Sequence, residues 1–267
     1  MSGFETRFQR LELKFLIDEP KADSIRRQIE PYCEIDPHSL DHPRRDDGHI
    51  GYEISSLYLD TPSLAFHRAK ERGDADRLKL RVRTYSKTSP ATLEVKRRYS
   101  DVIDKLRSVV DRDHVEPCVY GLLDGLDLDD HTESFLNQLG LLVATSGAAP
   151  TLTVKYDREA YSSVVDHYAR VTFDRQIRAR RTESWDLVLP EDEMWCRFDD
   201  YWCTDHVTLP IVMEIKCRKA VPLWLLDLIR RNNLSRCSFS KYSIGISLTG
   251  ERMGHRDAYS RSAKVMR

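Results

Sequence analysis

The chain has 267 residues, of which 40% are hydrophobic and 32% are charged, so it can bury a substantial core in one large domain or two smaller ones. Its 42 lysines and arginines nearly balance 43 aspartates and glutamates, which leaves a formal net charge of −1. Total charge therefore gives no support to non-specific nucleic-acid binding, and we expect no nucleic-acid partner.

Three features of the sequence bear on where the protein is located in the cell. No run of 18 apolar residues is present, and the N-terminal stretch MSGFETRFQRLELKF lacks the apolar core of a secretory signal. The six cysteines are scattered without a C-x-x-C pair, which favours reduced thiols over disulfides or a zinc site. We therefore expect a cytoplasmic protein with no membrane span of its own, although a membrane-protein partner stays open.

Strands and helices are expected to alternate irregularly along the chain. The expected strands cover about 8–17, 54–60, 77–85, 91–99, 151–161, 170–174 and 211–217, and the expected helices lie at about 21–30, within 116–142 and at 222–232. A polar, proline-interrupted loop is expected over 36–49. Since strands lie on both sides of the helical middle, we expect a single domain over residues 1–250 and a polar tail over 251–267. No regular βαβ alternation supports a doubly wound parallel sheet.

Four of the expected strands alternate charged and apolar residues. Side chains at positions i, i+2 and i+4 of a strand point to one face, so each strand carries a charged stripe and an apolar stripe. One such strand is ordinarily a solvated surface strand, whereas several together favour a shared ionic site. The charged stripes are Arg10, Glu12 and Lys14; Lys79, Arg81 and Arg83; Glu94, Lys96 and Arg98; and Glu214, Lys216 and Arg218.

A closed sheet would bring these stripes together around a lumen. The predicted fold is therefore α+β, with a closed antiparallel β-barrel around a charged lumen and helices packed outside. Crowded cations need an anion, and an extended chain of phosphates fits arginine forks and lysine point charges. The glutamates either orient these cations or hold a divalent metal that bridges phosphate oxygens. Glu214 is the first metal candidate, and Glu12 and Glu94 are further ones.

Short motifs in a fixed order resemble a known family. RLELKF, SSLYLDT, LKLRVRTY, LEVKRR, YDRE, ARVTFD, MEIK and FSKYSIG follow one another as in the VTC-type polyphosphate polymerase domain, within the triphosphate tunnel metalloenzyme (CYTH-like) superfamily. The resemblance covers nearly the whole chain, from about Phe8 to Gly245. It implies a β-tunnel that transfers the γ-phosphate of ATP to a growing inorganic polyphosphate chain with a divalent metal, Mn²⁺ or Mg²⁺.

The resemblance also assigns residues by motif position. Glu214 takes the place of the metal-binding glutamate, and Arg81, Arg83, Lys96 and Lys241 would clamp the donor phosphates with it. The other phosphate-binding residues implied by the motifs are Lys14, Lys105, Arg158, Arg170 and Lys216, to which the charged stripes add Arg10, Lys79 and Arg98.

One departure and several absences bear on the reaction. Hydrolytic members of the superfamily usually begin with E-x-E-x-K, whereas Arg10 stands at the first of these positions, which fits the polymerase branch. No K-x-D-G, P-loop or G-x-G-x-x-G motif is present, so side chains would hold the ATP phosphates. A metal-dependent triphosphate or polyphosphate hydrolase and a non-catalytic polyphosphate-binding module remain alternatives.

Overall fold

The protein was analysed as a computed structural model, which describes residues 10–40, 50–100, 102–166, 168–192, 194–198, 210–218 and 220–252. The chain divides into two compact units, each built from separate stretches of sequence. Unit 1 comprises Met1–Glu53, Tyr156–Ile177 and Asp199–Phe239, and unit 2 comprises Ile54–Lys155, Arg178–Phe198 and Ser240–Arg267. The single domain expected over residues 1–250 stays a prediction.

The described strands pair in the order β1-β10-β8-β7-β3-β4-β5-β6, with β2 beside β7 and β9 beside β8. The runs β1-β10-β8 and β3-β4-β5-β6 are antiparallel. The strands are β1 (Arg10–Ile17), β2 (Cys33–Ile35), β3 (Tyr52–Asp60), β4 (Asp76–Thr84), β5 (Ala91–Tyr99), β6 (Val102–Val110), β7 (Ala149–Ser163), β8 (Ala169–Arg181), β9 (Cys196–Arg197) and β10 (Ile211–Arg218). The helices are α1 (Glu19–Ile29), α2 (Pro37–Leu40), α3 (Ala65–Arg72), α4 (Val115–Val119), α5 (Asp130–Ser146), α7 (Leu223–Arg231) and α8 (Lys241–Arg252), with a 3₁₀ turn at Arg112–His114.

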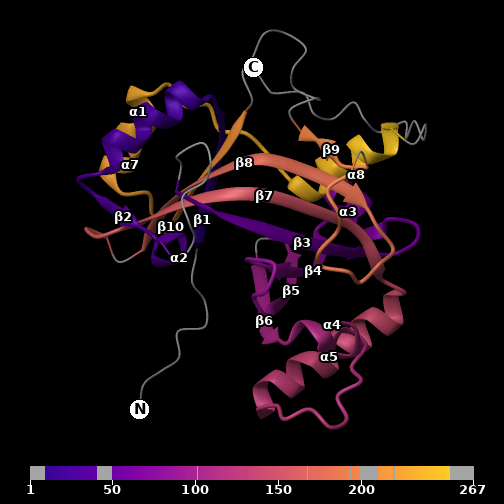
Figure 1. Cartoon of the computed structure of the whole chain (residues 1–267). Coiled ribbons are helices and arrows are strands. Elements are labelled where there is room, and N and C mark those ends of the chain that lie inside the picture. The colour runs from indigo at the N-terminus through magenta and orange to yellow at the C-terminus, as the bar shows by residue number, and fades with distance from the viewer. Residues whose placement is uncertain are drawn as a thin grey trace. The chain divides into compact units, whose positions relative to one another are not determined.

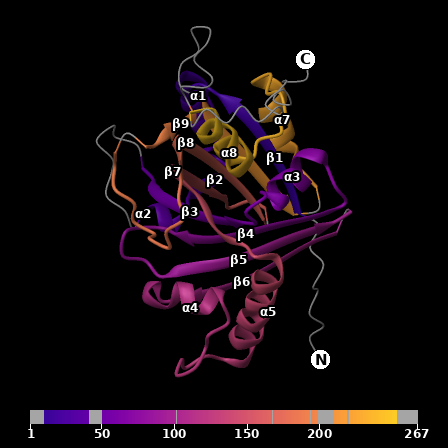
Figure 2. The ribbon, with the colours of Figure 1, turned by 90° about the vertical axis from the view of Figure 1, so that its right-hand side faces the viewer.

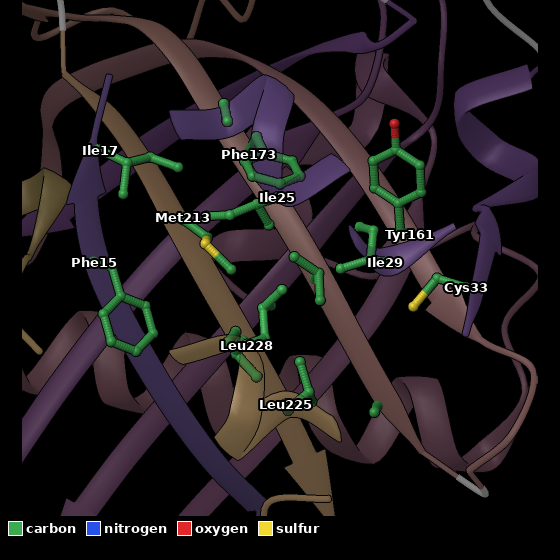
Figure 3. Close-up of a cluster of buried hydrophobic side chains, with 14 of the residues drawn as sticks. Phe15, Ile17, Ile25, Ile29, Cys33, Tyr161, Phe173, Met213, Leu225 and Leu228 are labelled. Atoms are coloured by element: carbon green, nitrogen blue, oxygen red, sulfur yellow. The ribbon is translucent and has the colours of Figure 1, made fainter. Parts of the chain in front are cut away.

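In unit 1, one face of β1, β10 and β8 is apolar and packs against α1 and α7 (Figure 3). Phe15, Met213 and Phe173 lie opposite one another on the three strands and are at most 2% exposed. Ile25 of α1 and Leu225 of α7 complete this core with no exposed surface. Since side chains alternate between faces, this register places the intervening charged residues on the other face.

Unit 2 repeats the arrangement with β4, β5 and β6. Leu80, Val82 and Leu93 belong to a second apolar cluster, to which Leu136 and Leu139 of α5 contribute. Figures 1 and 2 show α4 and α5 beside β5 and β6. Most charged residues of the three strands occupy the opposite face, whereas Asp76, Arg97 and Asp104 lie towards the strand ends on the apolar side.

The α+β class is confirmed, but the closed barrel was wrong. Among the described strands, the pairing order ends at β1 and β6, which do not pair with each other. The outer edge of β1 is partly occupied by a later segment of unit 1. Phe15 forms an isolated antiparallel bridge with Arg236, and the Cys237 amide donates to the Lys14 carbonyl at 2.8 Å. Those backbone groups are therefore not available to a closing strand.

Several elements were not expected from the sequence. They are β2, α3, β6, β9 and α8, and the expected loop over 36–49 contains α2 at its start. The tail over 251–267 falls almost entirely outside the described residues, as does Cys203. The other five cysteines are free, and four of them are buried. None of the described helices is both long and apolar enough to cross a membrane.

Truncating Phe173 should destabilise unit 1 strongly. Phe173→Ala removes a fully buried ring from beneath α1, so the free energy of unfolding should fall by about 3–5 kcal/mol. Leu223→Ala is the control, because Leu223 of α7 is 84% exposed and its loss should cost less than about 0.5 kcal/mol. Urea denaturation followed by circular dichroism measures both variants, and equal losses would contradict the assigned core.

Candidate functional site

The first ionic surface belongs to unit 1 and is called the Glu214 face. It comprises Glu12, Lys14, Arg158, Arg170, Glu214 and Lys216. The register of β1, β10 and β8 brings these side chains together. Lys14 of β1 lies opposite Glu214 of β10, which lies opposite Thr172 of β8. Glu12 lies opposite Lys216, which lies opposite Arg170, so the next row is ionic as well. Directly opposed side chains in antiparallel strands are close enough for opposite charges to interact.

Glu214 is the centre of this face. Its side chain is only 6% exposed, and its two oxygens lie near three cations. The distances are 3.4 Å to Nζ of Lys14, 3.1 Å to Nζ of Lys216 and 3.6 Å to Nη2 of Arg158. A buried carboxylate of this kind is stable as an anion because the surrounding cations offset its lost hydration.

Arg158 is held in a fixed orientation by Asp174. Its Nε and Nη2 each donate to one oxygen of this fully buried carboxylate at 2.7 Å. Burial lowers the pKa of Arg158, but the Asp174 carboxylate outweighs this effect and the pKa is raised well above its ordinary value. Two parallel hydrogen bonds fix the plane of the guanidinium, so Arg158 faces Glu214 as a pre-oriented cation.

The ammonium of Lys14 joins two carboxylates. Its Nζ lies 3.0 Å from Oε1 of Glu12 and 3.4 Å from Oε1 of Glu214, and it donates to the Phe239 carbonyl at 3.0 Å. Burial raises the pKa of Glu12, but Lys14 and Lys216 outweigh burial and lower it overall. The pKa of Lys216 is lowered, chiefly by burial, although Glu214 opposes the change.

A hollow opens beside Glu12 and Lys14. It measures about 440 Å³ and is lined by these two residues and by Arg236, Cys237, Ser238 and Phe239. Farther along the face, Nη2 of Arg170 lies 2.9 Å from Asp36, while Nε of Arg170 is buried without a hydrogen-bond partner among the described residues. A buried donor without a partner needs an explanation, and a bound ion or water is one of those that fit.

The second ionic surface belongs to unit 2 and is called the Glu94 face. It is the charged face of β4, β5 and β6. Glu94 is 4% exposed and forms ion pairs with Arg81 and Lys105, while Nη1 of Arg83 lies 4.0 Å away. The charged residues of this face are Arg77, Lys79, Arg81, Arg83, Glu94, Lys96, Arg98, Lys105 and Arg107.

Glu94 is the single carboxylate that β4, β5 and β6 place on this face. Burial raises the pKa of Glu94, but Arg81 and Arg83 outweigh it and hold the pKa well below its usual range. The pKa of Lys105 is lowered, chiefly by burial. Nε of Arg83 is buried without a hydrogen-bond partner among the described residues. One carboxylate therefore stabilises several cations, and an unused donor remains for an anion.

Four candidate residues remain, of which Lys79 and Arg98 lie on the Glu94 face and Lys241 and Arg10 do not. Lys79 lies opposite Lys96, and its ammonium is 5.7 Å from the centre of the Tyr58 ring. Nε of Arg98 donates to the Ser100 carbonyl at 2.7 Å. Lys241 begins α8, and the side chain of Arg10, at the start of β1, lies outside the described part of the chain.

Lys241 sits next to an anchored residue. Tyr242 donates its hydroxyl to Asp60 at 2.6 Å and stacks on Tyr58 with ring centres 4.8 Å apart. Asp60 also accepts hydrogen bonds from the amides of Phe66 and His67 at 2.9 Å, at the start of α3. The first turn of α8 is thereby fixed within unit 2.

The carboxylates differ in how well they suit a divalent metal. Within the described ranges, no group of three or more metal-ligating side chains is assembled. Glu12 and Glu214 share the Lys14 ammonium, so their oxygens converge on one place. Two carboxylates fit Mg²⁺ or Mn²⁺ that also binds substrate phosphates, since such ions commonly use one or two carboxylates with phosphate oxygens. Glu94 fits less well, because β4, β5 and β6 place no second carboxylate on its face.

Arg107 and Asp174 were missed by sequence reasoning. Arg107 lies opposite Glu94 on β6, and Asp174 orients Arg158 from β8. The signal for Arg107 was available, since Lys105-Leu106-Arg107 repeats the charged alternation of the other strands. The signal for Asp174 was only its place at the end of an apolar strand, which does not reveal an arginine partner.

Comparison with known proteins places this α+β chain in a family. The VTC domain model matches residues 9–249, so the chain belongs to the VTC domain family. No curated protein sequence matches the chain.

Three solved structures are among those to which the chain is similar. A candidate adenylate cyclase from Vibrio parahaemolyticus is 13% identical with a TM-score of 0.44, covering 88% of this chain and 96% of that one. A protein from Pyrococcus horikoshii is 13% identical with a TM-score of 0.43, covering 90% and 99%. A candidate adenylate cyclase from Bacillus halodurans is 10% identical with a TM-score of 0.45, covering 86% and 93%.

Neutralising Glu94 should strengthen anion binding. Glu94→Gln removes the internal anion that competes for Arg81 and Lys105, so affinity for tripolyphosphate should rise by about tenfold, or ~1.4 kcal/mol. Glu133→Gln on the exposed surface of α5 removes the same charge elsewhere and should change affinity little. Calorimetric titration measures both variants. Weaker binding, together with loss of metal dependence, would instead identify Glu94 as a metal ligand.

Anion affinity should also fall at alkaline pH. Because the pKa of Lys105 is lowered, its ammonium loses its proton below the ordinary lysine value of about 10.4 and no longer attracts phosphate. Lys105→Arg should retain the charge and make this part of the decline disappear. Titrations with tripolyphosphate between about pH 7 and about pH 9.5, with circular dichroism as a check on folding, measure the effect. Identical pH profiles for the two proteins would refute it.

Proposed function

We propose that the protein is a polyphosphate polymerase, which transfers the γ-phosphate of ATP to the end of an inorganic polyphosphate chain. The family match supports a polyphosphate-related activity. The observation that carries the proposal is Glu214, a buried carboxylate surrounded by Lys14, Lys216 and Arg158 and converging with Glu12. This combination of cations and paired carboxylates suits a phosphate substrate accompanied by a divalent metal.

The chemistry required of these residues is positioning and charge neutralisation. On the Glu214 face, Arg158 and Lys216 bind phosphate oxygens, and Arg158 is already oriented by Asp174. On the Glu94 face, Arg81 and Arg83 offer forks for the phosphates, with Nε of Arg83 as a ready donor. Lys96 and Lys241 add point charges on unit 2.

Glu214 and Glu12 would hold Mg²⁺ or Mn²⁺. The ion would supply positive charge, which would lower the cost of bringing anionic phosphates together. Lys14 lies between the two carboxylates, so its ammonium keeps them paired in the protein without ligands. The terminal phosphate of an acceptor chain is already anionic, so transfer to it requires no general base from the protein.

Two other activities would use the same residues differently. A hydrolase would need a group to orient or deprotonate water, and Glu12 or Glu94 are the available carboxylates. A binding module would need only the cations. The buried free thiols are consistent with a reducing compartment, and we place the activity in the cytoplasm.

One assay distinguishes the polymerase, the hydrolase and the binding module. Purified protein is incubated with ATP and Mn²⁺, and polyphosphate and free phosphate are measured separately. Long polymer is the expected product. Free phosphate without polymer would replace the proposal by a hydrolase, and tight polyphosphate binding with neither product would replace it by a binding module.

Glu214→Gln should abolish turnover but preserve anion binding. The amide keeps the volume of the side chain but loses the charge that holds the metal, so polymer formation should fall by at least about 100-fold. Affinity for tripolyphosphate without metal should be unchanged or higher, because Lys14 and Lys216 lose a competing anion. Glu34→Gln on β2, an exposed position, is the matched control. Loss of metal-free binding in a folded Glu214→Gln protein would argue against the metal role.

A further inference from the structure

Unit 2 contains a stretch of acidic sequence that the proposed function does not use. Residues 115–154 include no lysine or arginine, although the chain as a whole has 42 of them and a net charge of only −1. The carboxylates of this stretch are all exposed, and within the described residues none of them forms an ion pair. They are Glu116, Asp124, Asp127, Asp129, Asp130 and Glu133. Negative charge is therefore concentrated on one part of a chain whose remainder is net positive.

Exposed apolar side chains lie in the same stretch. The turn after α4 touches α5 at two glycines, so closely that a Cβ atom on Gly140 would lie only 2.8 Å from Cα of Gly121. Leu122 and Leu141 each follow one of these glycines in the chain, and they are 66% and 67% exposed. Tyr120 precedes the contact and is 42% exposed. Three large apolar side chains therefore reach solvent around one close contact, whereas exposed apolar residues on most surfaces are scattered singly.

The connection between α4 and α5 is held against the body of unit 2. Three of its leucines are partly buried against the apolar cluster of this unit, namely Leu123, Leu126 and Leu128. Asp124 and Asp127, which alternate with them, are exposed. Trp185 packs against the same cluster and meets the ring of Tyr120 edge-on, with ring centres 5.6 Å apart. The outward-facing residues are therefore presented by a supported segment of chain.

This surface does not overlap the Glu94 face. α5 packs on the apolar side of the strands through Leu136 and Leu139, whereas Glu94 lies on their other side. Figure 2 shows the connection between α4 and α5 on the side of these helices away from β6. A ligand bound there would leave the charged face of β4, β5 and β6 accessible.

We propose that Tyr120, Leu122, Leu141 and the six carboxylates of residues 115–154 form a docking surface for a basic amphipathic helix of a partner protein. Clustered exposed apolar side chains mark interaction sites, and an amphipathic helix binds by laying its apolar face on such a cluster. Lysines and arginines beside that face would meet carboxylates that have no cation here. The choice of a basic partner rests on this charge complementarity.

The dimensions of the surface suit a helix of moderate length. Eight residues separate Glu133 from Leu141, so these positions are about 12 Å apart along the axis of α5. A partner helix of about five turns is about 27 Å long and covers both the apolar contact and the acidic start of α5.

Charge also decides between a protein and other macromolecules. Nucleic acid and the anionic lipids of a membrane surface are attracted by lysine and arginine, and residues 115–154 offer neither. Exposed leucines alone would suit a bilayer, but the carboxylates around them repel one that carries negative charge. A positively charged protein segment satisfies both the apolar and the acidic residues. The inference goes beyond the proposed function and does not depend on it.

Selection from a peptide-display library tests the proposal. The library consists of helices of about 18 residues with leucine at positions i, i+3, i+4 and i+7 and with lysine, glutamate, glutamine or alanine at the others. Selection on the full-length protein should enrich peptides that carry lysine beside the leucine face. The leading peptide is then synthesised, and its affinity is measured by calorimetry at two ionic strengths.

Three variants locate the peptide on the protein. Leu141→Gln should weaken binding of the leading peptide by at least about tenfold, because it removes an apolar contact. Asp124→Asn combined with Asp127→Asn should weaken it by about threefold and make the affinity less dependent on salt. Leu223→Gln is the matched control, because Leu223 is 84% exposed on α7 of unit 1, and its affinity should change by less than about twofold. Circular dichroism verifies that each variant is folded.

Each outcome decides for or against the docking surface. Enrichment of basic peptides, with loss in Leu141→Gln and not in Leu223→Gln, supports it, whether or not the protein makes polyphosphate. No enrichment, enrichment of peptides without lysine, or equal losses in the two leucine variants would overturn it. Self-association in sedimentation equilibrium that Leu141→Gln abolishes would assign the surface to a second copy of the chain. Binding to phosphatidylserine vesicles that Leu141→Gln abolishes would assign it to a membrane.

Discussion

Both units depend on one electrostatic constraint: cations gathered on one face of a sheet must share a carboxylate that is almost completely buried. Glu214 has this role among Lys14, Lys216 and Arg158, and Glu94 has it among Arg81, Arg83 and Lys105. Removing water from any of these charges is costly, so each cluster is stable only because its members contact one another. The opposite faces of the strands are apolar and pack against helices. This packing holds in place the strands that carry the charged side chains.

The same arrangement explains how a cationic surface stays available to an anion. Each face keeps an arginine donor without a hydrogen-bond partner among the described residues, Nε of Arg83 on one and Nε of Arg170 on the other. An incoming phosphate therefore finds available donors, and on the Glu214 face it also finds Arg158 already oriented by Asp174. The phosphate still has to compete with the carboxylates of each face, and the moderated affinity would suit the proposed polymerase, which must also release a polyanion.

The sequence predicted the faces well because strand alternation is a local property. RLELKF and LKLRVRTY determine which side chains share a face without any knowledge of the partner strands. It did not predict closure, which depends on where a distant segment such as Arg236–Cys237 pairs. It also missed α8, which contains Gly245, a poor helix former; in the structure a side chain there would lie only 2.8 Å from Leu152 and 2.9 Å from Ala179. The edge strand β6 was missed because apolar residues occur on both of its faces.

The two terminal strands of the pairing order also differ in how they resist aggregation. An unpaired strand edge is a template for joining another copy of the protein. The edge of β1 is partly covered by the chain itself at Arg236 and Cys237. The edge of β6 has no such covering strand among the described residues, and it carries Lys105 and Arg107 instead. These cations would repel those of a second copy aligned on the same edge, which disfavours edge-to-edge pairing there.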